Sequence, residues 1–472
     1  MRQRAPSRPD APVWDAACRA VPQADGCSAE GPAARAAAVL LAAALLLWPA
    51  LYNGYPLVFA DSGTYLSQAI ERYLGWDRPV FYSLFLLPLH LTLTTWPAIG
   101  GQALLTACTL HLVQRALLPG CSPLWLVPLT AGAAVATALP WFAAQLMPDV
   151  FTPLLVLVLA SLAFVPARFQ AWERRCLVAF AAFMIATQHS SLPLALLLLP
   201  ALPLLSLAFQ RRAVRRRDWL RLAAPPLLAA LALVTVNLAA RGRPSVSPYG
   251  NVFLLARVIY DGPGQRTLQR ACPQAGWRLC LWRDRLPATS DDFLWRPDSP
   301  AVLAGGHRVL SAEADAIIGA ALRQEPAAEA AAFLRNLRRQ LGEFATGDGL
   351  QSWPDTVGRS IARDFPGFEQ AAYASSLQTR NRLAVPGWMQ SLHAAGALLG
   401  VAACLGLVAA GMLQPHPAAG FAAAVLLALV FNAGIAGGLS APHDRYQSRV
   451  MLLPPLVAVL GGAAMLRDRR LA

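Results

Sequence analysis

The sequence predicts an all-α polytopic membrane protein with about ten transmembrane helices, because of its composition, its long apolar runs and the placement of its arginines. Hydrophobic residues make up 56% of the 472 positions and charged residues 14%, which is too apolar for the surface of a water-soluble protein. A water-soluble enzyme is therefore nearly excluded, and membrane lipids are expected as partners.

The apolar runs are each long enough to cross a hydrocarbon layer about 30 Å thick as a helix. They span residues 36–52, 97–117, 122–140, 149–166, 176–192, 192–209, 222–240, 388–412, 418–438 and 449–466. The run at 79–96 is also apolar, but it is short and contains Pro88 and His90. We expect an interfacial or re-entrant helix there, in the first outer loop.

Arginine supplies all of the positive charge, since no lysine occurs and the formal net charge is +14. The arginines are not grouped with aromatic residues as in a nucleic-acid-binding module, so no nucleic-acid partner is expected. With ten spans, eighteen arginines fall on the side of the two termini and four in the short loops of the other side. The positive-inside rule then places both termini in the cytoplasm. Arginine without lysine, together with abundant alanine, is typical of a GC-rich bacterial genome, so we expect a bacterial inner membrane.

This threading divides the chain into four parts. Residues 1–34 form a cytoplasmic arm, which is long for the first part of a cleaved signal peptide and is expected to stay attached; the alternative is cleavage after Ala60. Residues 35–240 form a membrane core with outer loops at 53–96 and 141–148. Residues 241–387 form a periplasmic domain, and residues 388–472 carry the last transmembrane helices.

The periplasmic segment is expected to change character along its length. Residues 241–307 are rich in Pro, Gly and Trp, which is typical of an irregular loop region. Helices are expected afterwards, the first with Ser311 as N-cap and the second with Pro326 in its first turn. The second helix carries an apolar stripe that should pack on the membrane-facing rim, formed by Phe333, Leu337, Leu341 and Phe344.

The eight cysteines show no metal-ligand spacing. Cys272 and Cys280 lie in a polar stretch and could form a disulfide on an oxidising side of the membrane, or stay free.

Two aspartates in the outer loops are the main candidates for chemistry. Asp61 precedes Ser62, Gly63, Thr64 and Tyr65, which are small or hydroxylated residues that would let a polar ligand approach. The simpler interpretation is that Asp61 caps a helix running from Ser62 toward Tyr73. Asp149 follows Pro148 and either opens a helix or belongs to a site. The predicted topology places both acids on the same face, where they could act as a general base and an orienting or metal-binding carboxylate.

Basic residues on the same face could bind a phosphate. Arg445 and Arg449 are four residues apart and would share one helix face, offering donors at the depth of lipid headgroups. The alternative is an interfacial anchor with Tyr446 in the aromatic belt. His189, at the outer end of a span, could bind phosphate or remain solvated.

The order of these elements resembles the GT-C class of membrane glycosyltransferases, including protein mannosyltransferases and aminoarabinose transferases. Asp61 and Tyr65 are similar to an Asp-x-x-x-Tyr element of its first outer loop, and the RPVFYSL sequence at 78–84 resembles its Arg/Lys-Pro-Pro-x-Tyr segment. The MPDVFTP and DRYQSRVMLLP sequences resemble its second-loop aspartate element and its late Arg-Tyr segment. One departure concerns Ser62, which stands where a second acid would follow the first, so a requirement for a divalent metal ion stays open.

The resemblance implies transfer of a sugar from a polyprenyl-phosphate donor to a glycan, lipid or protein acceptor on the periplasmic face. Asp61 would deprotonate the acceptor and the anomeric carbon would be inverted. Arg445 and Arg449 would hold the phosphate, with Arg78 as a substitute. The competing functions are a transporter or flippase of a lipid-linked glycan, and a non-catalytic scaffold for envelope assembly. Transport would place polar or broken residues near span centres, whereas the polar residues here gather at outer ends.

Overall fold

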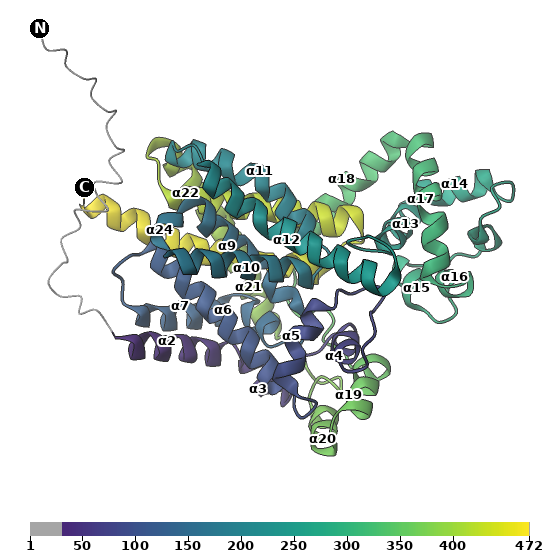
Figure 1. The fold of residues 1–472 in the computed structure, drawn as a ribbon, viewed down its shortest axis with the longest axis horizontal. Helices are drawn as coiled ribbons and strands as arrows, with labels where there is room; N and C mark the ends of the chain where they lie inside the picture. The colour runs from purple at the N-terminus through teal and green to yellow at the C-terminus, as the bar shows by residue number, and fades with distance from the viewer. Residues whose placement is uncertain (1–30, 472) are drawn as a thin grey trace, which may run out of the picture.

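The computed structural model describes residues 31–471, and within these residues every regular element is a helix (Figure 1). One isolated bridge, between Leu57 and Gln145, joins two loops. Most of the predicted N-terminal arm, residues 1–34, lies outside the described residues.

The first half of the chain builds one side of a helical bundle. Its helices are α2 (Pro32–Leu45), α3 (Trp48–Asn53), α4 (Ser62–Ile70), α5 (Phe81–His90), α6 (Trp96–Leu117), η1 (Pro123–Trp125), α7 (Leu126–Ala136), α8 (Leu139–Ala143), η2 (Pro148–Val150), α9 (Phe151–Phe164), η3 (Pro166–Arg168) and α10 (Ala171–Thr187). All fourteen residues of α9 are buried, so this helix lies in the interior of the bundle.

The second half completes the bundle and adds a group of shorter helices. It comprises α11 (Ser191–Gln210), α12 (Arg216–Arg241), α13 (Gly250–Tyr260), α14 (Pro263–Ala271), η4 (Arg278–Trp282), α15 (Ser290–Trp295), α16 (Pro300–Leu303), α17 (His307–Gln324), α18 (Pro326–Gly342), η5 (Pro354–Gly358), α19 (Arg359–Asp364), α20 (Gly367–Ser375), α21 (Gly387–Leu413), α22 (Pro417–Ala433), η6 (Gly434–Gly438), α23 (Asp444–Met451) and α24 (Leu453–Leu471).

Five helical segments among the described residues are long and apolar enough to cross a membrane, which indicates a membrane protein. They are α11, α12, α21, α22 extended through η6, and α23 joined to α24. The other predicted spans coincide with α2 and α3, α6, α7, α9 and α10. A helix of 14 residues such as α9 is only about 21 Å long, and α6 carries buried polar side chains such as Gln102 and Gln114. The expected number of about ten spans therefore stays a prediction.

The interfacial helix expected within 79–96 corresponds to α5, which has ten residues. Its length of about 15 Å is too short to cross a bilayer. Tyr82 and Leu86 are buried against the bundle, whereas Leu84 is exposed.

Residues 241–387 do not pack as a single body. Helices α13 to α17 have an apolar core of their own, whereas the segment with α19 and α20 contributes Ile361, Phe365 and Tyr373 to the core of the bundle. The expectation of an irregular region at 241–307 was wrong, because α13 to α16 lie there. Ser311 is not an N-cap either: α17 begins four residues earlier, at His307.

The predicted position of Pro326 in the first turn of a helix is confirmed by α18. The apolar stripe of α18 packs on η6, where Phe333 and Leu337 both lie 3.5 Å from the site of a Cβ at Gly434. A Cβ at Gly437 would lie 2.5 Å from the Cβ of Gln340. The glycines of η6 therefore allow α18 to rest directly on the end of α22.

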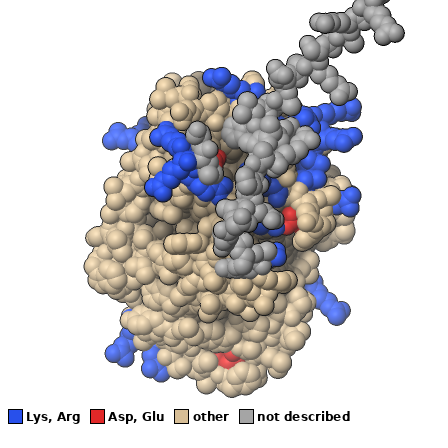
Figure 2. Space-filling view, turned by 90° about the vertical axis from the view of Figure 1, so that its left-hand side faces the viewer, with Lys and Arg blue, Asp and Glu red and all other residues tan. Residues whose placement is uncertain are grey.

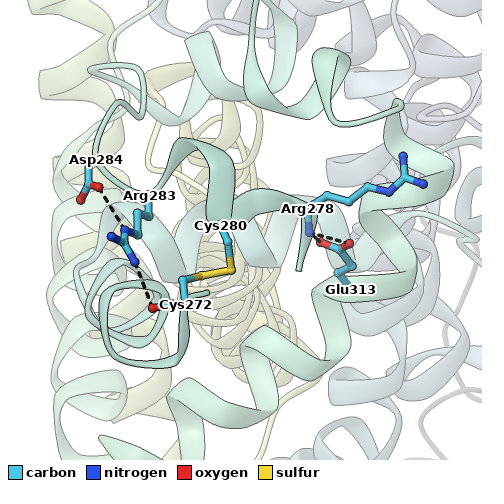
Figure 3. Close-up of a disulfide and its surroundings, with 6 residues drawn as sticks. All are labelled: Cys272, Arg278, Cys280, Arg283, Asp284 and Glu313. Atoms are coloured by element: carbon cyan, nitrogen blue, oxygen red, sulfur yellow. Dashed lines mark hydrogen bonds and ion pairs between the residues drawn. A yellow bond between two sulfur atoms is a disulfide. The ribbon is translucent and has the colours of Figure 1, made fainter. Parts of the chain in front are cut away.

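A disulfide joins Cys272, next to the end of α14, to Cys280 in η4 (Figure 3). Arg283 reinforces this connection by donating to the carbonyl oxygen of Cys272 at 2.9 Å. The two halves of the α14–η4 turn are thus held together covalently and by a hydrogen bond.

The two ends of the bundle differ in the segments that they carry. The C-terminus lies at one end and helices α13 to α17 at the other (Figure 1). Figure 2 shows that arginine side chains gather around the end with the C-terminus, where few acidic side chains are visible. We call the opposite end, with α13 to α17, the site end.

Candidate functional site

The first and second predicted outer loops are joined by backbone hydrogen bonds at the site end. The Leu57 N–H donates to the Ala144 carbonyl at 3.0 Å, and the Leu146 N–H donates to the Leu57 carbonyl at 2.8 Å. The Ser62 hydroxyl adds a bond to the Leu146 carbonyl at 2.9 Å. These contacts bring the start of α4 beside η2, and so bring Asp61 and Asp149 into one region.

Asp61 occupies the N-cap position of α4, but its carboxylate makes no capping hydrogen bond. The Arg78 guanidinium instead donates to Asp61 Oδ2 through Nη2 at 2.7 Å. The helix start at Ser62 was predicted correctly, while the capping role of the side chain was not. Asp61 therefore forms an ion pair with Arg78 instead of capping α4.

Asp149 is fully buried at the start of the α9 segment. Its Oδ1 accepts a hydrogen bond from Arg449 Nη1 at 2.8 Å, and its Oδ2 lies 3.6 Å from Arg445 Nη2. Gln188 donates to the same carboxylate at 3.5 Å. A buried ionised carboxylate that is shielded from solvent needs such partners, so the charge of Asp149 is stabilised by two arginines.

Arg445 connects the two acids. Its Nη2 lies 3.9 Å from Asp61 Oδ2 and 3.6 Å from Asp149 Oδ2. The guanidinium also stacks over the ring of Phe59, 3.7 Å from its centroid. Two of its nitrogens, Nε and Nη1, are buried without a hydrogen-bond partner among the described residues. These are cationic donors that still have bonding capacity.

Arg449 is the most deeply buried of these arginines, with a side chain 1% exposed. Besides Asp149, it donates through Nη2 to Ser190 Oγ and to Asn432 Oδ1, both at 3.2 Å. The ring of Tyr446 lies 5.5 Å from the Arg449 guanidinium and 5.7 Å from that of Arg445. The ring of Tyr446 thus lies beside both guanidinium groups, and its side chain is partly exposed.

We refer to Asp61, Asp77, Asp149, Arg78, Arg445 and Arg449 together as the acid–arginine cluster. Asp77 joins it because Arg78 Nε lies 3.7 Å from Asp77 Oδ2. Burial raises the pKa of Asp77, and the Arg78 charge opposes that shift. The formal charges of the cluster cancel, so an added anion has to compete with a carboxylate or use the free donors of Arg445.

Tyr65 and His189 lie at the edge of the cluster. Tyr65 is buried and packs edge-on against Tyr82, with ring centroids 4.9 Å apart. Burial raises the pKa of Tyr65, so its phenol stays protonated. His189 stands between Gln188 and Ser190, the two residues that bond to Asp149 and Arg449.

The small residues after Asp61 serve packing. A Cβ at Gly63 would lie 2.8 Å from the backbone carbonyl carbon of Thr356 in η5, and Ser62 bonds to Leu146. The expectation that these residues leave room for a polar ligand was therefore wrong for Ser62 and Gly63.

Several contacting residues were missed by reasoning from the sequence. They are Phe59, Asp77, Gln188, Ser190 and Asn432. Asn432 did carry a signal, since it is a polar residue inside the predicted span 418–438 and a buried amide needs a partner.

The arrangement does not fit a divalent metal ion held by the two acids. A guanidinium, that of Arg445, already lies between Asp61 and Asp149. Within residues 31–471, no three His, Cys, Asp or Glu side chains form a group that could hold a metal ion. The positive charge of the site comes from arginines.

Comparison with known proteins found that no family model, no curated protein and no solved structure matches this chain.

Proposed function

We propose that this protein is a membrane glycosyltransferase, which moves a sugar from a polyprenyl-phosphate donor to an acceptor hydroxyl at the periplasmic face of a bacterial inner membrane. The observation that carries the proposal is the position of Arg445. It lies 3.9 Å from Asp61 and 3.6 Å from Asp149, yet keeps two buried donor nitrogens without an acceptor.

These free donors favour a phosphate oxygen as ligand. A buried donor left without an acceptor costs about 1–3 kcal/mol, so an anion that reaches Arg445 relieves that cost. A guanidinium presents its donors as a planar fork that matches phosphate oxygens. Arg78 would be the second contact, because its side chain is 22% exposed and can be reached from solvent.

In the proposed reaction, Asp61 acts as the general base. When the donor phosphate draws Arg78 and Arg445 toward itself, the Asp61 carboxylate is released to accept the proton of the acceptor hydroxyl. The hydroxyl oxygen bonds to the anomeric carbon as the bond from that carbon to the phosphate oxygen breaks. Polyprenyl phosphate leaves with the electron pair, and the arginines stabilise its charge.

Asp149 has an orienting role in this proposal. Its side chain is 1% exposed and paired with both Arg445 and Arg449, so a substrate hydroxyl cannot reach it without unpacking the core. It holds the Arg445 guanidinium in place through the ion pair at 3.6 Å. No step uses a metal ion.

The test is release of polyprenyl phosphate from sugar-labelled polyprenyl-phosphate donors, offered to the purified protein in bilayers with a panel of hydroxyl acceptors. Asp61→Asn should abolish release while donor binding persists. Arg445→Ala should weaken donor binding by about 10- to 100-fold, the loss of one or two charge-assisted hydrogen bonds. Asp284→Asn, an exposed carboxylate away from the cluster, is the matched control. Wild-type release by Asp61→Asn would end the assignment of the base.

A further inference from the structure

Helices α13 to α18 contact both of the segments that carry Arg78 and Arg445. The first contact is an aromatic cluster at Trp76, two residues before Arg78. The Trp76 indole stacks on His307 and on Phe253, with interplanar angles of 14° and 11°. Trp295 packs against it at a tilt, with ring centroids 5.3 Å apart. Three helices, α13, α15 and α17, thus supply rings to one residue of the first outer loop.

The backbone beside Trp76 is held by hydrogen bonds from α12. Arg241, the last residue of α12, donates through Nη2 to the carbonyl oxygens of Leu74 and Gly75 at 3.0 and 2.9 Å. Arg78 follows shortly afterwards in the sequence and donates a hydrogen bond to Asp61. The chain just before Arg78 is therefore held by the end of α12 as well as by α13, α15 and α17.

The second contact is with the segment that leads into α23. Gln340 of α18 exchanges two hydrogen bonds with the backbone of His443, at 2.8 and 3.0 Å. Asp348 accepts the backbone N–H of Arg445 at 3.2 Å. His443 also lies 3.6 Å from Asp291 of α15. The Arg445 segment is thus held by α15, α18 and the loop after α18.

A buried polar network joins the two sets of contacts. Arg257 of α13 pairs with Glu329 of α18, and both side chains are at most 5% exposed. Arg257 also pairs with Asp261 at 2.7 Å, and Asn336 of α18 donates to Asp261 at 2.8 Å. Removing one member of such a pair is costly, so α13 and α18 are firmly connected.

We propose that α13 to α18 form a positioning clamp that aims Arg78 and Arg445 at one ligand, with Trp76 as the positioning residue for Arg78. This inference rests on the proposed function only for its ligand, a polyprenyl phosphate group. The clamp matters because Arg78 has two carboxylate neighbours, Asp61 at 2.7 Å and Asp77 at 3.7 Å. Holding Trp76 favours the pairing with Asp61, which keeps both arginines at one carboxylate.

The test compares Trp76→Ala with Trp76→Phe, which retains a stacking ring. Binding of polyprenyl phosphate in nanodiscs is measured for both, each with Arg78 and with Arg78→Ala. Trp76→Ala should weaken binding about tenfold when Arg78 is present and by less than about twofold in the Arg78→Ala background, because a positioning residue acts through its partner. Trp76→Phe should remain within about twofold of wild type. Trp172→Ala, an exposed tryptophan outside the aromatic cluster, is the control.

A readout without ligand keeps the clamp separate from the proposed function. In an Arg78→Cys variant, the rate at which a charged thiol reagent modifies residue 78 is followed by mass spectrometry. Adding Trp76→Ala should raise that rate severalfold, and adding Trp76→Phe should not. If wild type fails to bind polyprenyl phosphate but this difference is present, the proposed ligand is wrong and the clamp stands. Equal modification rates, or additive effects of Trp76→Ala and Arg78→Ala on binding, would overturn the clamp.

Discussion

Replacing Arg449 with methionine leaves the buried carboxylate of Asp149 without its closest partner. Arg449 Nη1 lies 2.8 Å from Asp149 Oδ1, and both side chains are 1% exposed. At an effective dielectric constant of 20, charges at that separation attract by about 6 kcal/mol before desolvation is counted. Arg445 remains at 3.6 Å and keeps part of that interaction.

The expected net loss of stability for Arg449→Met is about 3–5 kcal/mol, the usual result of breaking a buried pair. The double variant Arg449→Met with Asp149→Leu removes both charges and should recover most of this loss. The assay is equilibrium unfolding in mixed detergent micelles, followed by circular dichroism, for wild type, both single variants and the double variant. A loss below about 1 kcal/mol for Arg449→Met, or equal losses for the single and double variants, would refute the dependence of Asp149 on Arg449.

Three further predictions concern the surroundings of the cluster. Gly349→Ala should reduce both stability and donor binding, because Gly349 has φ +80° and a Cβ there would overlap the Phe59 ring beneath Arg445. Thermal unfolding measures the loss of stability and donor titration the loss of binding, and unchanged donor binding would contradict this prediction. Burial lowers the pKa of His90 to about 4 from 6.5. The unfolded chain therefore binds the proton first, and stability falls as pH drops from 6.5 toward 4. The unfolding midpoint of His90→Gln should fall less steeply over that range, and parallel curves of midpoint against pH for the variant and wild type would exclude this contribution. Replacing Cys272 and Cys280 with serine should lower the stability of the α13–α17 region by about 2–3 kcal/mol, as expected for so short a loop. Hydrogen exchange with and without reductant measures this loss, and equal protection of the amides in the variant and wild type would contradict the prediction.

The residues alone were enough to predict the all-helical class and the membrane character of the chain. Hydropathy is a local property, so the apolar runs locate helices such as α11, α21 and α24. Local signals also located the helix starts at Ser62 and Pro326. They failed at 241–307, where Pro and Gly separate short helices that are stable because they share a core.

The candidate site was predicted in its members more than in its arrangement. Asp61, Asp149, Arg445 and Arg449 were selected from the sequence, and the structure brings them together. Their pairing could not be predicted, because it follows from the backbone bridge between Leu57 and Gln145 and from contacts across the bundle.

The role of each polar residue was decided by packing. An aspartate before a helix looks the same in the sequence whether it caps that helix or pairs with an arginine, and Asp61 does the second. Asp149 and Arg449 are 300 positions apart, a separation over which neither local propensity nor hydropathy carries information. Composition and periodicity determine which segments are buried away from water. Only the close packing of those segments determines which buried charges face one another.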